Sequence, residues 1–162
     1  MEWRKGASAY KYSGIAVVVP ASTTKDGIVR DEPPAMEVDL SDVNDCGTTL
    51  LKAIEVSRQG FVDPNPLAFR FEYVLAALAV SSYKKFAKSG SQVAVTIVNG
   101  KAVFEPMKRA NSGNYFESIP NSRIESELDP RSMGTALAAA FASCESNDAK
   151  AVAYPTKASR KH

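Results

Sequence analysis

The residues of this chain that are best suited to chemistry are carboxylates. Glu37 and Asp39 alternate along one predicted strand, and Glu125 and Glu127 along another, so each pair lies on one side of its strand. Paired carboxylates are what glycoside hydrolysis and Mg²⁺ binding require. Solvent-exposed acids are far more common on strands than catalytic pairs are. A small hydrolase that works through paired carboxylates is therefore an alternative and not the first interpretation.

Other catalytic and ligand-binding patterns are missing from the sequence. The single histidine is the last residue, His162, which argues against Ser-His-Asp and Cys-His catalysis and against histidine-ligated metals. Cys46 and Cys144 lack the spacing of zinc ligands, and we expect both to be buried free thiols. Neither GxxxxGK[ST] nor GxGxxG occurs. We therefore expect a protein that is not an enzyme and holds no cofactor or metal.

Charge is distributed unevenly although the totals are balanced, with a net charge of +2 over 162 residues. Such a small excess gives no reason to expect nucleic-acid or membrane binding through bulk charge. One segment nevertheless holds seven acids against Arg30 alone, namely Asp26, Asp31, Glu32, Glu37, Asp39, Asp42 and Asp45. The segment 83–109 is basic, and its Lys84, Lys85 and Lys88 allow a second alternative, a small nucleic-acid-binding module.

Strand signals predict a mostly antiparallel sheet. Alternating apolar residues flank Asn99-Gly100, which marks a two-residue hairpin that pairs Ile97 with Ala102 and Val95 with Phe104. Further strands are expected at 9–12 and 15–21 around Ser13-Gly14, at 36–40, and as a short edge strand at 123–128. Residues 110–122 are rich in Asn, Ser and Gly and are expected to form a loop that Tyr115-Phe116 anchors.

About three helices are expected to cover this sheet, which gives an α+β fold. The first spans roughly 42–57 after a cap at Ser41 or Asp42, and the last opens at Asp129-Pro130. The segment 67–80 is apolar on nearly all sides, which predicts the most buried helix. With 44% hydrophobic residues the chain can bury a real core, so we expect a single domain at 1–145 and a polar, basic, fraying tail at 146–162.

The helices at either end of the chain are similar to one another. This similarity predicts two related halves, each with a few strands followed by a helix, in a βββα order. The matches are Gly47-Thr48 with Gly134-Thr135, Leu50 with Leu137, Ala53 with Ala140, Ile54 with Phe141, and, ahead of the helices, 13–17 with 91–95.

A set of short motifs in a fixed order also resembles a known family. The motifs are Trp3, Tyr12-Ser13-Gly14, 18–21, Asp26-Gly27-Ile28, 31–34, 47–54 and 82–86. Over about residues 3–144 the chain is similar to the contact-dependent growth inhibition (CDI) immunity proteins. The resemblance implies a cytoplasmic protein without activity of its own. It would bind and neutralise the toxic C-terminal domain of a large secreted effector, commonly a nuclease and often one that cuts tRNA.

The resemblance supplies no contact residues, so the predicted contact surface rests on charge. Nucleases bind phosphates through basic surfaces, and an acidic patch can imitate phosphates and speed association. We therefore predict that the seven acids between Asp26 and Asp45 bind the toxin domain. No direct contact with nucleic acid or membrane is expected. The apolar run 15–19 is too short to span a bilayer, and a soluble cytoplasmic protein is the prediction.

Overall fold

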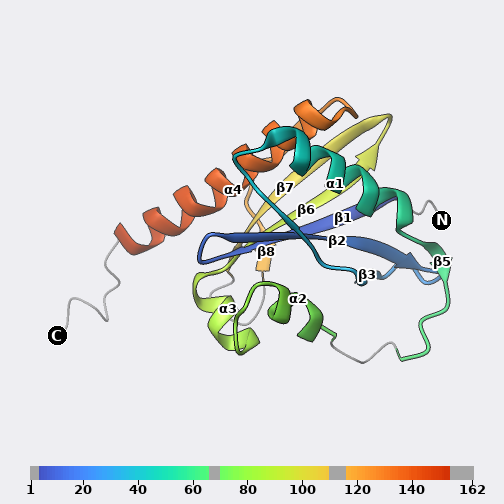
Figure 1. The fold of residues 1–162 in the computed structure, drawn as a ribbon, viewed down its shortest axis with the longest axis horizontal. Helices are drawn as coiled ribbons and strands as arrows, with labels where there is room; N and C mark the ends of the chain where they lie inside the picture. The colour runs from blue at the N-terminus through green and yellow to red at the C-terminus, as the bar shows by residue number, and fades with distance from the viewer. Residues whose placement is uncertain (1–3, 66–69, 110–115, 154–162) are drawn as a thin grey trace.

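A mostly antiparallel sheet forms the centre of the molecule, with the strand order β3-β2-β1-β6-β7-β8 (Figure 1). The computed structural model describes residues 4–65, 70–109 and 116–153. Within these ranges the strands are β1 (Gly6–Tyr12), β2 (Ile15–Thr24), β3 (Val29–Asp31), β4 (Met36–Val38), β5 (Gln59–Phe61), β6 (Ser91–Val98), β7 (Lys101–Arg109), β8 (Phe116–Ser118) and β9 (Ile124–Ser126). The helices are α1 (Val43–Val56), α2 (Glu72–Ala77), α3 (Tyr83–Ser89) and α4 (Pro130–Ala153). The predicted α+β class is confirmed.

Two tight hairpins build the middle of the sheet. Asn99 and Gly100 adopt φ values of 50° and 76°, and the register pairs Ile97 with Ala102 as predicted. Ser13 and Gly14 form the matching turn between β1 and β2, with φ values of 49° and 83°. Positive φ at both central positions is the geometry that suits the right-handed twist of the flanking strands.

Short strands line the two outer long strands. Strand β4 pairs with the start of β2 and β3 with its end, while β9 pairs with the start of β7 and β8 with its end. Strand β5 runs parallel to the end of β2. The predicted edge strand at 123–128 is therefore confirmed as β9. The predicted loop at 110–122 contains β8, whose Phe116 packs on Phe86 with ring centroids 5.7 Å apart.

The two long helices cover one face of the sheet, and α2 and α3 lie on the other (Figure 1). Each long helix begins at a predicted cap. Asp42 accepts a hydrogen bond from the Asp45 N–H at 3.1 Å, and Asp129 accepts one from the Ser132 N–H at 2.8 Å. Beneath α1 and α4 the main core is formed by buried side chains that include Val18, Leu50, Val93, Phe104, Met133, Leu137 and Phe141.

The prediction that 67–80 forms the most buried helix is wrong. Residues 66–69 lie outside the described part of the chain, and α2 has only six residues, of which Val74 alone is buried. The described part of this segment is rich in apolar residues because Phe71 and Leu78, at either end of α2, pack into a second, smaller hydrophobic core beneath that helix. Ala79 takes a positive φ of 56°, which ends the helix there.

The two related halves are present, but among the described residues each has four strands and not three. The order β1-β2-β3-β4-α1 is repeated as β6-β7-β8-β9-α4. The proposed match of 13–17 with 91–95 is wrong, because the first segment enters β2 and the second lies in the central strand β6. The structural counterpart of Ser13-Gly14 is Asn99-Gly100, the turn at the same place in its half.

The C-terminal helix crosses the predicted boundary between domain and tail. Helix α4 continues to Ala153, past residue 145. The division into 1–145 and 146–162 remains a prediction, and residues 154–162, like Trp3 and Tyr115, lie outside the described residues.

Candidate partner-binding site

A pocket of about 780 Å³ lies on the sheet face opposite α1 and α4. Its floor comes from β1 and β6, where Ser8, Tyr10 and Thr96 contribute side chains, and its walls include aromatic residues such as Phe61 and Phe71. Tyr10 and Phe71 meet edge to face with ring centroids 5.0 Å apart. The pocket therefore combines a polar floor with rigid apolar walls, a composition that is typical of ligand and partner sites.

Asp31 belongs to this pocket and is already bonded within the protein. Its Oδ1 accepts a hydrogen bond from Ser8 Oγ at 2.7 Å, and its Oδ2 accepts one from the Tyr10 hydroxyl. Burial raises the pKa of Asp31, against the opposing effect of these two hydrogen bonds. Burial, with the Asp31 charge as a second cause, raises the pKa of Tyr10. Asp31 thus ties the end of β3 to β1 and does not project from the surface as a contact residue would.

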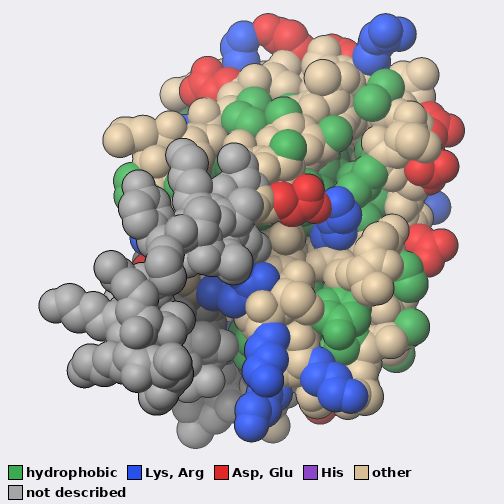
Figure 2. All heavy atoms as spheres, turned by 90° about the vertical axis from the view of Figure 1, so that its left-hand side faces the viewer, with side chains coloured by type: hydrophobic (Ala, Val, Ile, Leu, Met, Phe, Trp, Pro, Cys, Tyr) green, Lys and Arg blue, Asp and Glu red, His purple; other side chains and the backbone are tan. Residues whose placement is uncertain are grey.

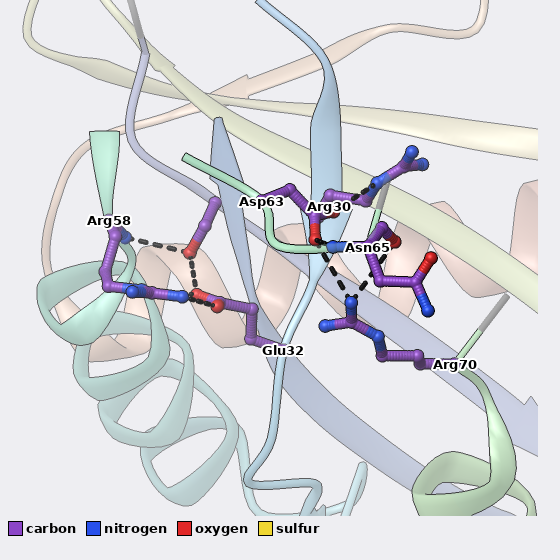
Figure 3. A network of polar contacts seen from close by, with 7 residues as sticks. Arg30, Glu32, Arg58, Asp63, Asn65 and Arg70 are labelled. Atoms are coloured by element: carbon purple, nitrogen blue, oxygen red, sulfur yellow. Dashed lines mark hydrogen bonds and ion pairs between the residues drawn. The ribbon is translucent and has the colours of Figure 1, made fainter. Parts of the chain in front are cut away.

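Glu32 is also engaged inside the molecule (Figure 3). Its carboxylate accepts hydrogen bonds from Ser22 Oγ and from both Nε and Nη2 of Arg58, the Nε contact at 3.1 Å. The Arg58 guanidinium in turn lies 4.1 Å above the ring centre of Phe61. Arg58 is the main reason that the pKa of Glu32 lies below its ordinary value. This carboxylate therefore joins the segment after β3 to β5.

Asp63 makes a second ion-pair network at the rim of the pocket (Figure 3). Its Oδ2 lies 3.2 Å from Arg30 Nε and its Oδ1 lies 3.1 Å from Arg70 Nη2, while the backbone N–H of Asn65 donates to Oδ1 at 2.9 Å. The side chain is only 4% exposed. The Asn65 N–H, followed by the two guanidinium groups, lowers the pKa of Asp63. Sequence reasoning missed this network.

The other five predicted acids are exposed but do not form one surface. Glu37 on β4 and Asp39, Asp42 and Asp45 around the start of α1 follow one another closely. Asp26 lies in the turn after β2, whereas Glu37 pairs with Val17 near the start of that strand. Thr24 lies seven positions beyond Val17 along β2, roughly 23 Å at the rise of a β-strand. The predicted seven-acid surface is therefore divided into pocket residues, a group at the start of α1, and Asp26 by itself.

Several of the exposed acids also have local structural roles. Asp39 Oδ1 accepts hydrogen bonds from the Ser41 N–H at 2.9 Å and from Ser41 Oγ at 2.6 Å, which lowers its pKa. Asp42 caps α1. Among the described residues, the side-chain carboxylates of Asp26 and Glu37 accept no hydrogen bond and form no ion pair. These two are the acids whose charge is most available to a partner.

The geometry gives little support to the alternative function of a hydrolase with paired carboxylates. Only the first member of each predicted carboxylate pair stands on a strand, Glu37 on β4 and Glu125 on β9, because these strands end before Asp39 and Glu127. Neither Glu37 nor Glu125 lines the large pocket. Glu127 is paired with Lys101 Nζ at 2.5 Å. Within the described ranges no group of three or more His, Cys, Asp or Glu side chains could hold a metal ion. No helix in those ranges is long and apolar enough to cross a bilayer.

The basic residues lie on a different side from the acids at the start of α1. Lys84, Lys85 and Lys88 are exposed on the short helix α3. Figure 2 shows Lys and Arg side chains gathered in the lower part of one face, while others stand at its top beside Asp and Glu side chains, which also occur along its right-hand edge and near its centre.

Comparison with solved structures supports the fold expected from the sequence. A protein of unknown function from Neisseria meningitidis matches with a TM-score of 0.69 and 19% identity, over 87% of this chain and 95% of that one. A chain of the CdiA-CT/CdiI toxin and immunity complex from Yersinia pseudotuberculosis matches with a TM-score of 0.69 and 12% identity, over 89% and 98%. No protein-family model and no curated protein sequence matches the chain. The predicted resemblance to CDI immunity proteins is confirmed at the level of the fold.

Proposed function

We propose that this chain is an immunity protein that binds the toxic C-terminal domain of a CDI effector in the cytoplasm and so neutralises it. The observation that carries the proposal is the fold match to a chain of a toxin and immunity complex, which extends over nearly the full length of both chains. A match over 89% of this chain and 98% of the other is too extensive to reflect only a common substructure.

The proposed target is a nuclease domain, possessing the basic surface that nucleic-acid substrates require. The exposed acids of this chain fit that partner. Glu37, Asp39, Asp42 and Asp45 present four carboxylates on consecutive elements, β4 and the start of α1, and Asp26 adds a fifth at the opposite end of β2. Asp31 and Glu32 are proposed to hold β3 and the chain after it in place, because their oxygens are already bonded.

Coexpression with the toxin domain that is encoded beside this protein tests this function. The C-terminal domain encoded by the adjacent effector gene is produced in a cell with or without the present protein, and growth is measured. We expect growth to be restored by this protein, and we expect the two purified proteins to form a 1:1 complex by light scattering. Growth inhibition that persists in the presence of well-folded protein would contradict the proposal.

The nuclease assignment needs its own measurement. The purified toxin domain is incubated with tRNA, total RNA and DNA, and cleavage is followed as the present protein is added. We expect cleavage of one of these substrates to stop at equimolar inhibitor. If the protein binds the toxin and protects cells but the toxin cuts none of these nucleic acids, immunity stands and the nuclease target is wrong.

A further inference from the structure

The pairing of the two central strands is symmetric about a two-fold axis. Ser8 on β1 lies opposite Ala94 on β6, and these two residues are counterparts, since each lies six residues before the glycine of its own hairpin turn. The two pairs that flank Ser8 and Ala94 are equivalent, because each residue of one pair is the counterpart of a residue of the other pair. Ala7 faces Val95, and the counterpart pair Ala9 and Val93 face each other in the same way. A two-fold axis therefore passes between Ser8 and Ala94.

Helices α1 and α4 are related by the same two-fold axis. Gly47 of α1 lies against Pro130, the first residue of α4, and Gly134 of α4 lies against Val43, the first residue of α1. Each glycine stands four residues after the residue that its counterpart contacts. Reciprocal contact of this kind, in which one surface meets a copy of itself, is the signature of an isologous two-fold interface.

The outer part of each half repeats in detail as well. The Pro20 carbonyl accepts a hydrogen bond from the Glu32 N–H at 2.9 Å, and the Pro106 carbonyl accepts one from the Ile119 N–H at 3.0 Å. Both prolines face the central strand of their own half, opposite Ala7 and Val93. From the turn onward, the sequence identities are Gly14 with Gly100, Ala16 with Ala102, Val17 with Val103 and Pro20 with Pro106. Each half thus contains a complete hairpin, two outer strands and a helix.

We infer that the chain is a covalent pseudo-dimer of one ββββα unit, and that a second copy of the chain can supply either half through domain exchange. The halves are joined by the long connection that contains β5, α2 and α3. A covalent connection holds the two halves of one chain at high effective concentration, so the closed monomer dominates. Exchange between chains becomes dominant when one chain is disabled in its first half and the other in its second half, because only the two remaining halves, from different chains, can then form an intact interface.

Complementation between full-length chains tests this inference. Leu50 and Leu137 are counterparts on α1 and α4, and both are fully buried. Leu50→Asp and Leu137→Asp each place a charge in the main core and are expected to prevent folding of the chain alone. Unfolded together and refolded as a mixture, the two variants are expected to give a dimer by light scattering with near-UV circular dichroism about half that of the unaltered protein. A mixture that shows only the sum of the two separate signals overturns the inference.

A matched control mixes two variants whose substitutions lie in the same half. Leu50→Asp and Ala53→Asp both disable α1, so a mixture of these variants contains no intact first half. This mixture should regain no near-UV circular dichroism and form no dimer. Equal recovery in this control would mean nonspecific association and would also overturn domain exchange.

A second measurement needs no core variant. Isotopically light and heavy copies of the unaltered chain are unfolded together, refolded at high concentration and treated with a lysine cross-linker. Exchange predicts a dimer fraction that rises with the refolding concentration, with cross-links from a light first half to a heavy second half. A dimer without such cross-links, or no dimer at any concentration, contradicts the inference.

Discussion

Gly47 lies so close to Pro130 that a Cβ built on it would stand 1.7 Å from the Pro130 carbonyl oxygen. At the counterpart Gly134 the distance to the Val43 carbonyl oxygen would be 1.8 Å. Backbone on both sides leaves no flexible side chain that could move aside. The absence of a side chain at these two positions is therefore what allows α1 and α4 to cross at their first turns.

Gly47→Ala and Gly134→Ala are each expected to destabilise the protein. Alanine favours a helix over glycine by about 1 kcal/mol, but overpacking a tight contact typically costs about 1–3 kcal/mol and here forces the two backbones apart. Because the clash is with backbone atoms, the upper end of that cost applies, and we expect a net loss of about 2 kcal/mol in the free energy of unfolding, measured by urea denaturation. The exposed neighbour Thr48→Ala is the control and should change little. A stabilised Gly47→Ala protein would show that the helices do not cross here.

Features that depend on neighbouring residues could be predicted from the sequence. The Asn99-Gly100 hairpin has its register set by a two-residue turn, and Asp42 and Asp129 cap helices through N–H groups three residues away. The Ala, Leu and Gly spacing on the two long helices was enough to indicate the repeat. These predictions succeeded because the determining contacts lie within a few residues of one another.

Features that depend on distant residues could not be predicted. Asp63 pairs with Arg30, 33 residues away, only because β3 and β5 are both held by the end of β2. Asp31 appeared to be one surface acid among seven, yet its side chain faces Ser8 and Tyr10 on β1, across β2. Nearness in sequence was taken as nearness in space, which holds at the start of α1 but fails along β2. The pocket has no local signal because seven different strands contribute residues to its lining.

Asp31→Asn is expected to change how stability depends on pH. The folded-state pKa of Asp31 is raised above its ordinary value of 3.8, so the folded protein binds more protons than the unfolded chain in the interval above 3.8. The contribution of Asp31 to stability therefore falls as pH rises through that interval and is constant above the folded pKa. Asparagine can still bond to both hydroxyl groups and does not titrate.

Urea denaturation from pH 3.5 upward measures this effect. The variant should gain stability relative to the unaltered protein as pH rises above 3.8, and the difference should then level off. Asp26→Asn, which removes an exposed carboxylate, is the control for the loss of one negative charge. A difference between the Asp31 variant and the unaltered protein that runs in the opposite direction would mean that the hydrogen bonds to Asp31 outweigh its burial.

Asp63→Asn should have the opposite pH dependence. The folded-state pKa of Asp63 lies below its ordinary value of 3.8, so its contribution to stability is present above 3.8 and is lost as pH falls through the folded pKa. At neutral pH the variant is expected to be less stable, because Arg30 and Arg70 lose the carboxylate they share. Thermal unfolding at pH 7 and pH 3 should show a difference that shrinks at the lower pH. A difference that stays constant would assign the loss to hydrogen bonding and not to charge.

Reversal of charge at Glu37 should slow association with the toxin domain. Glu37 is exposed on β4 and accepts no ion pair among the described residues, so Glu37→Lys changes the surface potential without breaking an internal contact. Steering by charge acts mainly on the association rate and weakens with ionic strength, since the screening length is about 8 Å at physiological salt. We expect the rate constant to fall by about tenfold at low salt, and by less at high salt, in stopped-flow binding.

Glu55→Lys provides the matched control for this prediction. Glu55 is exposed on the same helix as Asp45 but lies near its other end, outside the acidic segment 26–45. Both variants make the same change in net charge and should melt at the same temperature as the unaltered protein. If only position matters, Glu37→Lys slows association and Glu55→Lys has a small effect. Equal slowing by the two variants would mean that net charge alone steers the partner, and no slowing by either would remove the start of α1 and β4 from the proposed contact surface.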